Sequence, residues 1–214
     1  VSRQLPEGMR HMAKPYTDGL GRLDVPLARV PQCVEVSQVL MAGTGWRVEP
    51  VPALIPFGRF FSMLADRTFP AASFIRKRKH FDYIEEPDIF HEVFGHTPLL
   101  TDPRFAAFSE AIGKAGVVAA KEDYSWLIRL YWFSIEFGLT VEDGATKGLG
   151  SGLASSISEL RWAVAGEGRK APERRPFDVL DMLRTPYRID ILQPVYFVIS
   201  DLDDLFAAAK RDLL

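Results

Sequence analysis

Apolar residues recur at helical spacing along most of the chain after residue 30. Residues 34–40 carry such an apolar stripe, and Gly43 and Gly45 are expected to end the helix. The next segment, WRVEPV at 46–51, alternates between apolar and polar residues and predicts a short strand. FGRFFSMLADR at 57–67 then places three phenylalanines and a leucine on one side of a predicted helix.

The helical pattern continues through the middle of the chain. EPDIFHEVFG at 86–95 has a proline and an aspartate where a first helical turn accepts them, and we expect its Gly95 to end the helix. DPRFAAFSEAIGKAGVVAA opens with Asp102 as an N-cap. KEDYSWLIRLYWFSIEFGL at 121–139 is the most apolar helical stretch of the chain.

The last third of the chain predicts shorter elements. SISEL at 156–160 has the spacing of a capping box and is expected to start another helix. Residues 187–200 are expected to be extended with an interruption at Pro194, and residues 201–214 to form a final helix. Only a few short strands are predicted, pairing at one edge, so the fold class is mainly α.

We expect a single folded domain, because 214 residues suffice for one hydrophobic core and are few for two. Residues 1–30 are rich in glycine, proline and charge and show no sustained period. They are predicted to form a loosely structured N-terminal arm that packs onto the domain formed by residues 31–214.

The composition is that of an ordinary globular protein, with 47% hydrophobic and 25% charged residues. A formal net charge of −2 predicts no general attraction to nucleic acid or to an anionic membrane. The basic run at 75–80 is expected to be a solvated segment, apart from Arg76, which is considered separately below. Cys33 is the only cysteine, which excludes an intrachain disulfide and a cysteine-based metal cluster. There is no signal-peptide core or long apolar run, so we expect a soluble cytoplasmic protein.

HEVFGH at 91–96 contains two of the four histidines, separated by five residues. Metalloproteases place two histidines four residues apart on one helical face. Five residues of a straight α-helix leave two side chains about 140° apart, so His91 and His96 could share a metal only if the helix were interrupted. Gly95 could interrupt it by adopting a left-handed conformation. A zinc hydrolase with Glu92 as its base, and two unrelated histidines, are the alternatives.

Glu136 is the sole acidic residue in the apolar run LIRLYWFSIEFGL. A carboxylate buried there would cost several kcal/mol unless it were paired or bound to a cation. Arg129, seven residues earlier, is one candidate partner. The other hypothesis joins Glu136 to His91 and His96 as a set of two imidazoles and one carboxylate, the arrangement of non-haem iron(II) oxygenases, which leaves metal positions open.

EPDIFHEVFGHTPLL together with RLYWFSIEFGL resembles the pterin-dependent aromatic amino acid hydroxylases, and within them the bacterial phenylalanine-hydroxylating branch. The similarity continues through TGWRVEPVPALI, FPAASFIRKRKHFDYIEEPD, GLASSISEL and RTPYRIDILQPVYFVI, and covers roughly residues 30–208. The resemblance implies a single catalytic domain of that type. It implies that His91, His96 and Glu136 hold iron(II), and that a tetrahydropterin and dioxygen (O2) react there.

The resemblance also implies which residues contact the pterin. The ring of Phe60 matches the position that stacks on the cofactor, and Glu92 matches a carboxylate that faces it. Tyr131 matches a tyrosine close to the iron. The rest of the implied pterin pocket is the backbone around Ala53, Ile55 and Phe57.

For the substrate, Arg76 matches an arginine that binds the carboxylate of the amino acid, and its guanidinium group suits bidentate contact. Asp88 is expected to hold that arginine, and the bulk of Trp132 favours a substrate with a single aromatic ring. The remaining implied substrate contacts are Phe137 and Ile189 at the ring pocket and Ser155 and Glu159 at its polar edge.

The implied reaction is conversion of L-phenylalanine to L-tyrosine. Hydroxylation of another ring position or of another aromatic substrate such as tryptophan, and a catalytically silent metal-binding homologue, remain alternatives. Ile84 and Glu85 depart from the pattern of the animal enzymes, and Leu149 replaces a tyrosine. We expect neither a regulatory domain nor a coiled-coil tail, and we therefore expect a monomer.

Overall fold

The computed structural model describes residues 8–26, 28–77, 86–165 and 171–210. Helices dominate the described chain, and six short strands accompany them, which confirms the mainly α fold class. The helices are α2 Lys14–Leu23, α3 Cys33–Gly43, α4 Phe57–Ala65, η2 His91–His96, α5 Thr97–Leu100, α6 Pro103–Val118, η3 Lys121–Asp123, α7 Tyr124–Tyr131, η4 Trp132–Glu136, α8 Ser151–Ser155, α9 Ile157–Ala165, α10 Val179–Arg184 and α11 Leu202–Ala208. The strands are β1 Arg47–Val51, β2 Thr68–Ala72, β3 Leu139–Glu142, β4 Ala145–Gly148, β5 Glu173–Pro176 and β6 Val195–Val198.

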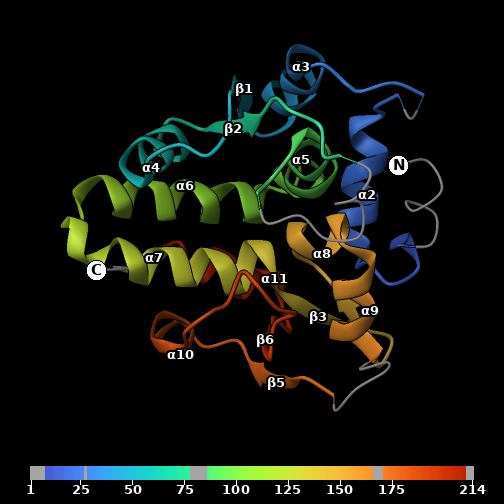
Figure 1. Cartoon of the computed structure of the whole chain (residues 1–214), viewed down its shortest axis with the longest axis vertical. Helices are drawn as coiled ribbons and strands as arrows, with labels where there is room; N and C mark the ends of the chain where they lie inside the picture. Colours follow the sequence, from blue (N-terminus) through green and yellow to red (C-terminus); the bar gives the residue numbers. More distant parts are fainter. Residues whose placement is uncertain (1–7, 27, 78–85, 166–170, 211–214) are drawn as a thin grey trace.

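Helix α6 lies side by side with α7, which continues directly into η4, through the middle of the molecule (Figure 1). Helix α4 packs on α6, and α11 packs on another side of it. Large side chains fully buried among these helices include Phe61, Phe105 and Phe133. This apolar core holds α4 and α7, which carry Phe60 and Tyr131, in a fixed relation.

Most of the predicted helices are confirmed. The apolar stripe after residue 33 forms α3, the three-phenylalanine segment forms α4, and the C-terminal segment forms α11. Asp102 caps α6 as expected, because its side chain accepts the backbone N–H of Arg104. Residues 156–160 do begin α9, although the carboxylate of Glu159 turns toward Gln193 and Tyr196 rather than serving the helix start.

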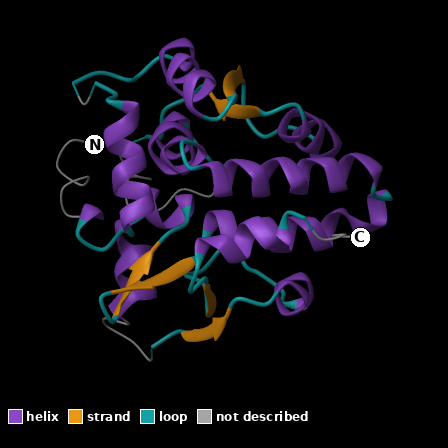
Figure 2. Cartoon of the chain, turned by 180° about the vertical axis from the view of Figure 1, so that it is seen from behind, coloured by secondary structure: helices purple, strands orange, loops and turns teal. Residues whose placement is uncertain are grey.

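The strands form two separate sheets, whereas the sequence analysis predicted that the strands pair at one edge of the fold. Strands β1 and β2 pair in parallel, whereas the other four are arranged β4-β3-β6-β5. The sheets lie on opposite sides of the α6–α7 pair, also when seen from behind (Figure 2). Strand β2 is buried at every position and therefore lacks the alternation that revealed β1, and β3 to β5 have only four residues each.

The described part of the N-terminal thirty residues is partly helical where the sequence predicted loose chain. Helix α2 packs on α5, and Tyr16 and Leu23 on it are buried in the core. The hydroxyl of Tyr16 donates a hydrogen bond to the carbonyl oxygen of Phe94 in η2. Two glycines in α2 weaken its helical signal in the sequence. The segment packs onto the rest of the chain as expected, and its boundary near residue 30 stays a prediction.

No helix within the described ranges combines the length and apolar character needed to cross a bilayer. The sequence run at 75–80, of which residues 78–80 lie outside the described part, was interpreted as solvated. Within it, Ile75 is exposed but Arg76 is 9% exposed and faces inward, into a cavity. This position of Arg76 agrees with its separate assignment to a substrate-binding role in the sequence analysis.

Gly113 sets the distance between α6 and α4. A Cβ atom at this position would lie 2.3 Å from the backbone nitrogen of Ala65 and 2.7 Å from the carbonyl carbon of Leu64. Since neither backbone atom can move independently of α4, we expect Gly113→Ala to lower the free energy of unfolding by about 1–3 kcal/mol. Urea denaturation measures this loss.

Gly21 provides the matched control, because it lies within α2 and a Cβ atom there meets nothing within 4 Å. We expect Gly21→Ala to raise stability by about 0.5–1 kcal/mol, since alanine favours a helix over glycine. Equal effects of the two substitutions would show that helix propensity, and not the α4–α6 approach, decides the outcome at Gly113.

Candidate active site

A π-helical turn, η2, brings the two histidines together. Its hydrogen bonds run from residue i to i+5, so residues five apart lie on the same face. The Nε2 atoms of His91 and His96 are 2.9 Å apart. The predicted break at Gly95 is wrong: Gly95 stays within the π-turn, and the chain continues into α5. The alternative of two unrelated histidines is also wrong.

The absence of a side chain at Gly95 is nevertheless required by the packing around it. A Cβ atom there would lie 2.9 Å from the carbonyl oxygen of Ser151 and 3.1 Å from its Cβ atom. Glycine therefore allows η2 to approach α8 closely. This approach matters for the site, because Ser155 on α8 contacts His91 and Ser151 on the same helix contacts Glu136.

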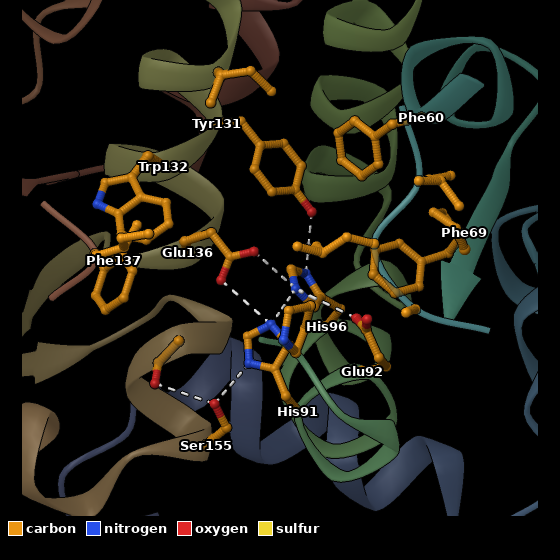
Figure 3. A pocket seen from close by; sticks show the side chains of 18 of the residues that line it. Phe60, Phe69, His91, Glu92, His96, Tyr131, Trp132, Glu136, Phe137 and Ser155 are labelled. Atoms are coloured by element: carbon orange, nitrogen blue, oxygen red, sulfur yellow. Dashed lines mark hydrogen bonds and ion pairs between the residues drawn. The ribbon is translucent and has the colours of Figure 1, made fainter. Parts of the chain in front are cut away.

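Glu136 ends a second π-turn, η4, and points at the histidines (Figure 3). Its Oε1 lies 3.0 Å from Nε2 of His96, and its Oε2 lies 3.6 Å from Nε2 of His91. The alternative pairing of Glu136 with Arg129 is wrong, since the guanidinium group of Arg129 donates to the carbonyl oxygen of Leu183 and lies over Trp126.

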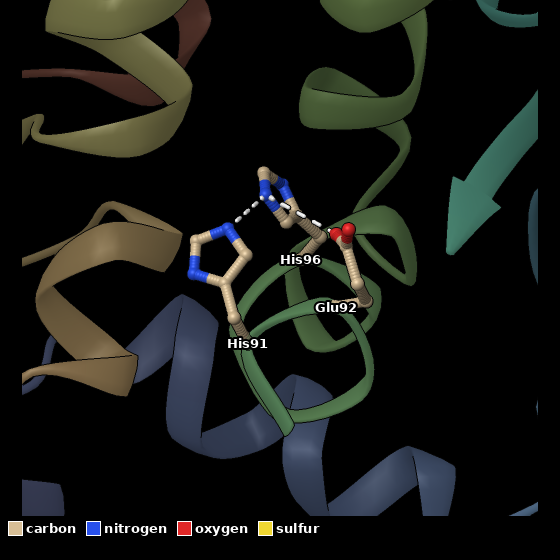
Figure 4. A group of neighbouring side chains, drawn as sticks. All are labelled: His91, Glu92 and His96. Carbon is tan, nitrogen blue, oxygen red and sulfur yellow. Dashed lines mark hydrogen bonds and ion pairs between the residues drawn. The ribbon is translucent and has the colours of Figure 1, made fainter. Parts of the chain in front are cut away.

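Two carboxylates compete for the place beside the imidazoles. His91, Glu92 and His96 have potential ligand atoms within 4.8 Å of one another (Figure 4). However, Oε2 of Glu92 is 3.9 Å from Nε2 of His96, whereas Oε1 of Glu136 is at 3.0 Å. Ligands about 2.0–2.1 Å from a metal and at right angles to one another lie about 3 Å apart. His91, His96 and Glu136, called the histidine–carboxylate cluster below, therefore fit three adjacent positions of one ion, and Glu92 lies further out.

The two carboxylates also differ in their electrostatics. Burial by itself would raise the pKa of Glu136, but the charges of His96 and His91 and hydrogen bonds from both rings hold it well below its usual range. Burial raises the pKa of Glu92 to about 8, although His91 and the backbone N–H of Ala72 oppose the shift. Glu136 is thus the carboxylate that keeps its negative charge at neutral pH, as a cation ligand must.

Neighbouring side chains fix the orientation of each member of the cluster. The hydroxyl of Ser155 lies 2.8 Å from Nδ1 of His91, and that of Tyr131 lies 3.3 Å from Nδ1 of His96. Ser151 donates a hydrogen bond of 2.9 Å to Oε2 of Glu136. Contacts of this kind orient ligands around protein-bound metals and raise their affinity.

The cluster lies in a cavity of about 390 Å³ whose lining is mostly apolar. Every residue that the sequence analysis assigns to the metal, pterin or substrate site lines this cavity, with the exception of Asp88. Those residues are Ala53, Ile55, Phe57, Phe60, Arg76, His91, Glu92, His96, Tyr131, Trp132, Glu136, Phe137, Ser155, Glu159 and Ile189. The fold thus collects into one place side chains that are up to 136 positions apart, counting from Ala53 to Ile189 (189 − 53).

Arg76 brings a buried positive charge to the cavity. Its Nε and Nη2 atoms donate to the two carboxylate oxygens of Asp88 at 2.9 and 2.7 Å, and its Nη1 atom lies 3.4 Å from the carbonyl oxygen of Ser155. Asp88 is fully buried, and it holds Arg76 from behind the cavity wall, as predicted from the sequence. The departures at Ile84 and Glu85 lie outside the described residues.

Aromatic rings line the cavity on both sides of the cluster, with Phe60 and Phe69 on one side and Trp132 and Phe137 on the other (Figure 3). The indole of Trp132 packs 4.7 Å from the ring of Phe137. The indole of Trp132 also stacks on the ring of Tyr187, with ring centroids 4.4 Å apart.

Sequence reasoning missed several residues of this site, among them Tyr187, Phe69 and Ser151. Tyr187 and Phe69 line the cavity, and the ring of Phe69 packs 4.6 Å from His96. Ser151 contacts Glu136 from the start of α8. Their positions become significant only through contacts with distant parts of the chain, so no local pattern could have revealed them.

Glu159 forms a buried polar edge of the cavity. It is 1% exposed, and its Oε1 accepts hydrogen bonds from the backbone N–H of Gln193 and from the hydroxyl of Tyr196. Its Oε2 is buried and has no hydrogen-bond partner. Burial raises the pKa of this carboxyl, and the two hydrogen bonds oppose that shift.

Two imidazoles and one carboxylate that converge inside a mostly helical and apolar cavity are the donor set of the class of mononuclear non-haem iron enzymes that activate dioxygen. Comparison with known proteins narrows this class. Residues 22–212 match the family model described as biopterin-dependent aromatic amino acid hydroxylase. The chain belongs to this family.

Relatives and solved structures agree with this assignment. The chain is 49% identical to phenylalanine-4-hydroxylase of Vibrio cholerae over all 214 residues, which span 73% of that protein. The structure of the cold-active phenylalanine hydroxylase of Colwellia psychrerythraea superimposes with a TM-score of 0.91 at 46% identity, covering 98% of this chain and 80% of that one. That of Chromobacterium violaceum phenylalanine hydroxylase, with iron(III) and 7,8-dihydrobiopterin bound, has a TM-score of 0.87 at 41% identity, covering 95% and 73%.

Proposed function

We propose that this protein is an iron(II)- and tetrahydropterin-dependent monooxygenase that converts L-phenylalanine to L-tyrosine. The observation that carries the proposal is the position of the histidine–carboxylate cluster between two aromatic-lined halves of one cavity, which also contains the cation of Arg76. The names of the relatives and the iron and dihydrobiopterin in one similar structure support it.

His91, His96 and Glu136 would hold the iron, since their donor atoms have the spacing of three adjacent ligands. A site of this kind has further positions for small ligands. Ser155, Tyr131 and Ser151 keep the donor atoms oriented toward a common point.

The half of the cavity on the Phe60 side would take the pterin. The ring of Phe60 packs at right angles to that of Tyr131, with centroids 5.3 Å apart, which fixes it as a stacking surface. Glu92 lines the same cavity and offers a hydrogen-bonding carboxyl group. The backbone around Ala53 and Ile55 would complete the pocket.

The half on the Trp132 side would take the amino acid. The guanidinium group of Arg76 would bind its carboxylate, with Asp88 holding the group in place and Ser155 beside it. Trp132 and Phe137 would enclose the aromatic ring, and Ile189 would cover it from the loop that follows α10. Enclosure by these side chains removes water from around the reacting ring.

When bound, the iron and the tetrahydropterin supply the electrons with which dioxygen is activated for insertion of one oxygen atom into the ring. The chain contributes the relative placement of the three reactants. Its helical core holds the histidine–carboxylate cluster on η2 and η4 between the two halves of the cavity, so the ring of a bound amino acid would face the cluster.

The test is to incubate iron(II)-loaded protein with a tetrahydropterin, oxygen and L-phenylalanine, and to identify the product by liquid chromatography and mass spectrometry. We expect L-tyrosine, and little product from L-tryptophan because Trp132 narrows the ring pocket. Predominant hydroxylation of tryptophan would identify the other family activity. Metal binding without any hydroxylated product would identify a catalytically silent homologue.

We further propose that the enzyme acts as a monomer in the cytoplasm on a free aromatic amino acid. The modest net charge of −2 supports a partner that is neither nucleic acid nor an anionic membrane. Light scattering after size-exclusion chromatography tests the monomer, for which the expected mass is 24.0 kDa.

A further inference from the structure

The buried side chain of Gln193 lies behind the Trp132 side of the cavity and connects several parts of its wall without lining the cavity itself. Gln193 is 1% exposed. Its side chain and its backbone both make hydrogen bonds. The partners belong to segments that line the cavity or to segments that support the cavity wall. A buried glutamine with its polar atoms so used constrains its neighbours, because any movement leaves polar groups without partners.

The first connection is to Trp132. The indole Nε1–H of Trp132 donates to Oε1 of Gln193 at 3.2 Å. Stacking on Tyr187 and the tilted contact with Phe137 place the indole plane, but such contacts tolerate sliding and rotation in that plane. The hydrogen bond removes this freedom and selects one orientation of the indole.

The second connection is to the loop that follows α10. The side-chain amide nitrogen of Gln193 donates to the carbonyl oxygens of Arg188 and Ile191. Residues 186–194 contain no helix or strand, and the loop carries two cavity-lining residues, Tyr187 and Ile189. The amide group therefore supplies backbone hydrogen bonds that regular structure would otherwise provide, and it holds the loop against the indole.

The third connection uses the backbone of Gln193 and anchors it to α9. Its N–H donates to Oε1 of Glu159 at 2.8 Å, and its carbonyl oxygen accepts the indole N–H of Trp162 at 3.0 Å. These two bonds do not depend on the side chain. A substitution at position 193 can thus remove the connections to Trp132 and to the loop while the anchor to α9 stays in place.

We propose that Gln193 is a positioning residue that determines the ring size the cavity accepts, by fixing the Trp132 indole and the Tyr187–Ile189 part of the loop in one arrangement. The inference rests on the proposed function in that it takes this half of the cavity as the amino acid site. Without the glutamine amide, the indole N–H and two loop carbonyls lose their buried partners, and the wall relaxes toward a wider pocket.

The test compares Gln193→Met with Gln193→Glu in the iron-loaded full chain. Methionine keeps the length of the side chain and removes its hydrogen bonds, whereas glutamate keeps an acceptor for the indole. For Gln193→Met we expect about a tenfold higher KM for phenylalanine and about a tenfold smaller preference for phenylalanine over tryptophan in kcat/KM, with the KM for the pterin changed less than twofold. Gln193→Glu should restore part of the preference.

Trp162→Phe is the matched control, because it removes the other indole N–H that reaches Gln193 and leaves the Trp132 contact intact. It should lower the melting temperature without changing the substrate preference. If Gln193→Met shifts only the melting temperature, or if Trp162→Phe shifts the preference equally, Gln193 is a structural residue and the proposal is wrong.

A readout independent of turnover is the nitrogen-15 spectrum of the indole N–H groups, of which the chain has four. The Trp132 signal, assigned with Trp132→Phe, should move and exchange with solvent at least tenfold faster in Gln193→Met, and should be unchanged in Trp162→Phe. An unchanged signal overturns the proposal. If the parent protein forms no hydroxylated amino acid, the proposed function fails. The same variants are then compared by calorimetric titration with phenylalanine and tryptophan, where equal affinities in all variants overturn the positioning role separately.

Discussion

Glu136→Ala is expected to lower the affinity for iron(II) by more than about 100-fold and to abolish pterin-dependent hydroxylation. Loss of a residue that merely orients a metal ligand costs 10–100-fold in affinity, and Glu136 lies within 3.0 Å of one imidazole and 3.6 Å of the other. The substitution also leaves the two imidazoles without the negative charge that faces them. Calorimetric titration with iron(II) under anaerobic conditions measures the affinity, and circular dichroism checks that the helical content is retained.

Glu92→Ala is the matched control, since Glu92 is the other carboxylate beside the histidines and is 3.9 Å from His96. We expect it to keep iron affinity within about tenfold of the parent protein and to weaken binding of the pterin instead. His91→Ala should behave like Glu136→Ala. Full iron affinity in Glu136→Ala together with its loss in Glu92→Ala would contradict the proposed ligand set and replace Glu136 by Glu92.

Arg76→Ala is expected to raise the KM for phenylalanine by at least about 100-fold, because it removes the cation proposed to bind the substrate carboxylate. The structure adds a second effect. Asp88 would be left as a fully buried carboxylate that has lost its ion pair, although the backbone N–H groups of residues 76 and 91 still bond to it. Breaking a buried pair in this way costs about 3–5 kcal/mol of stability. Steady-state kinetics and urea denaturation measure the two effects.

The double variant Arg76→Ala/Asp88→Ala separates them. It removes both charges, so much of the stability lost in Arg76→Ala should return, while the weak binding of phenylalanine should remain. Recovery of substrate affinity along with stability would mean that Arg76 only supports the fold. In that case the carboxylate of the substrate binds elsewhere.

Helix propensity and apolar periodicity are local properties of the sequence, and they sufficed to predict the main helices. The stripe in α3, the Asp102 cap of α6 and the apolar run that became α7 were all predicted because the hydrogen bonds concerned join residues at most four apart. The short strands β3 to β5 were missed, since four residues carry too little pattern and each strand exists only through its partner.

The helix around His91 shows where local reasoning failed. Five-residue spacing is incompatible with a shared face on a straight α-helix, and a break at Gly95 was the local solution. The chain instead widens into a π-turn, which aligns His91 with His96 and needs no break. Packing against α8 favours this conformation, because Gly95 lies against Ser151, a residue 56 positions further along the chain (151 − 95).

From the sequence alone came the kinds of side chain that the chemistry needs, the helices that carry them and the resemblance to a family of pterin-dependent hydroxylases. These follow from residue identity and from interactions within a few positions. The tertiary structure showed that Glu136 faces the two histidines and not Arg129, and it alone decided that Tyr187 stacks on Trp132 and that Gln193 bonds to Trp132 and to the loop that carries Tyr187. Such contacts join residues from different elements, and their distances depend on how the whole core packs.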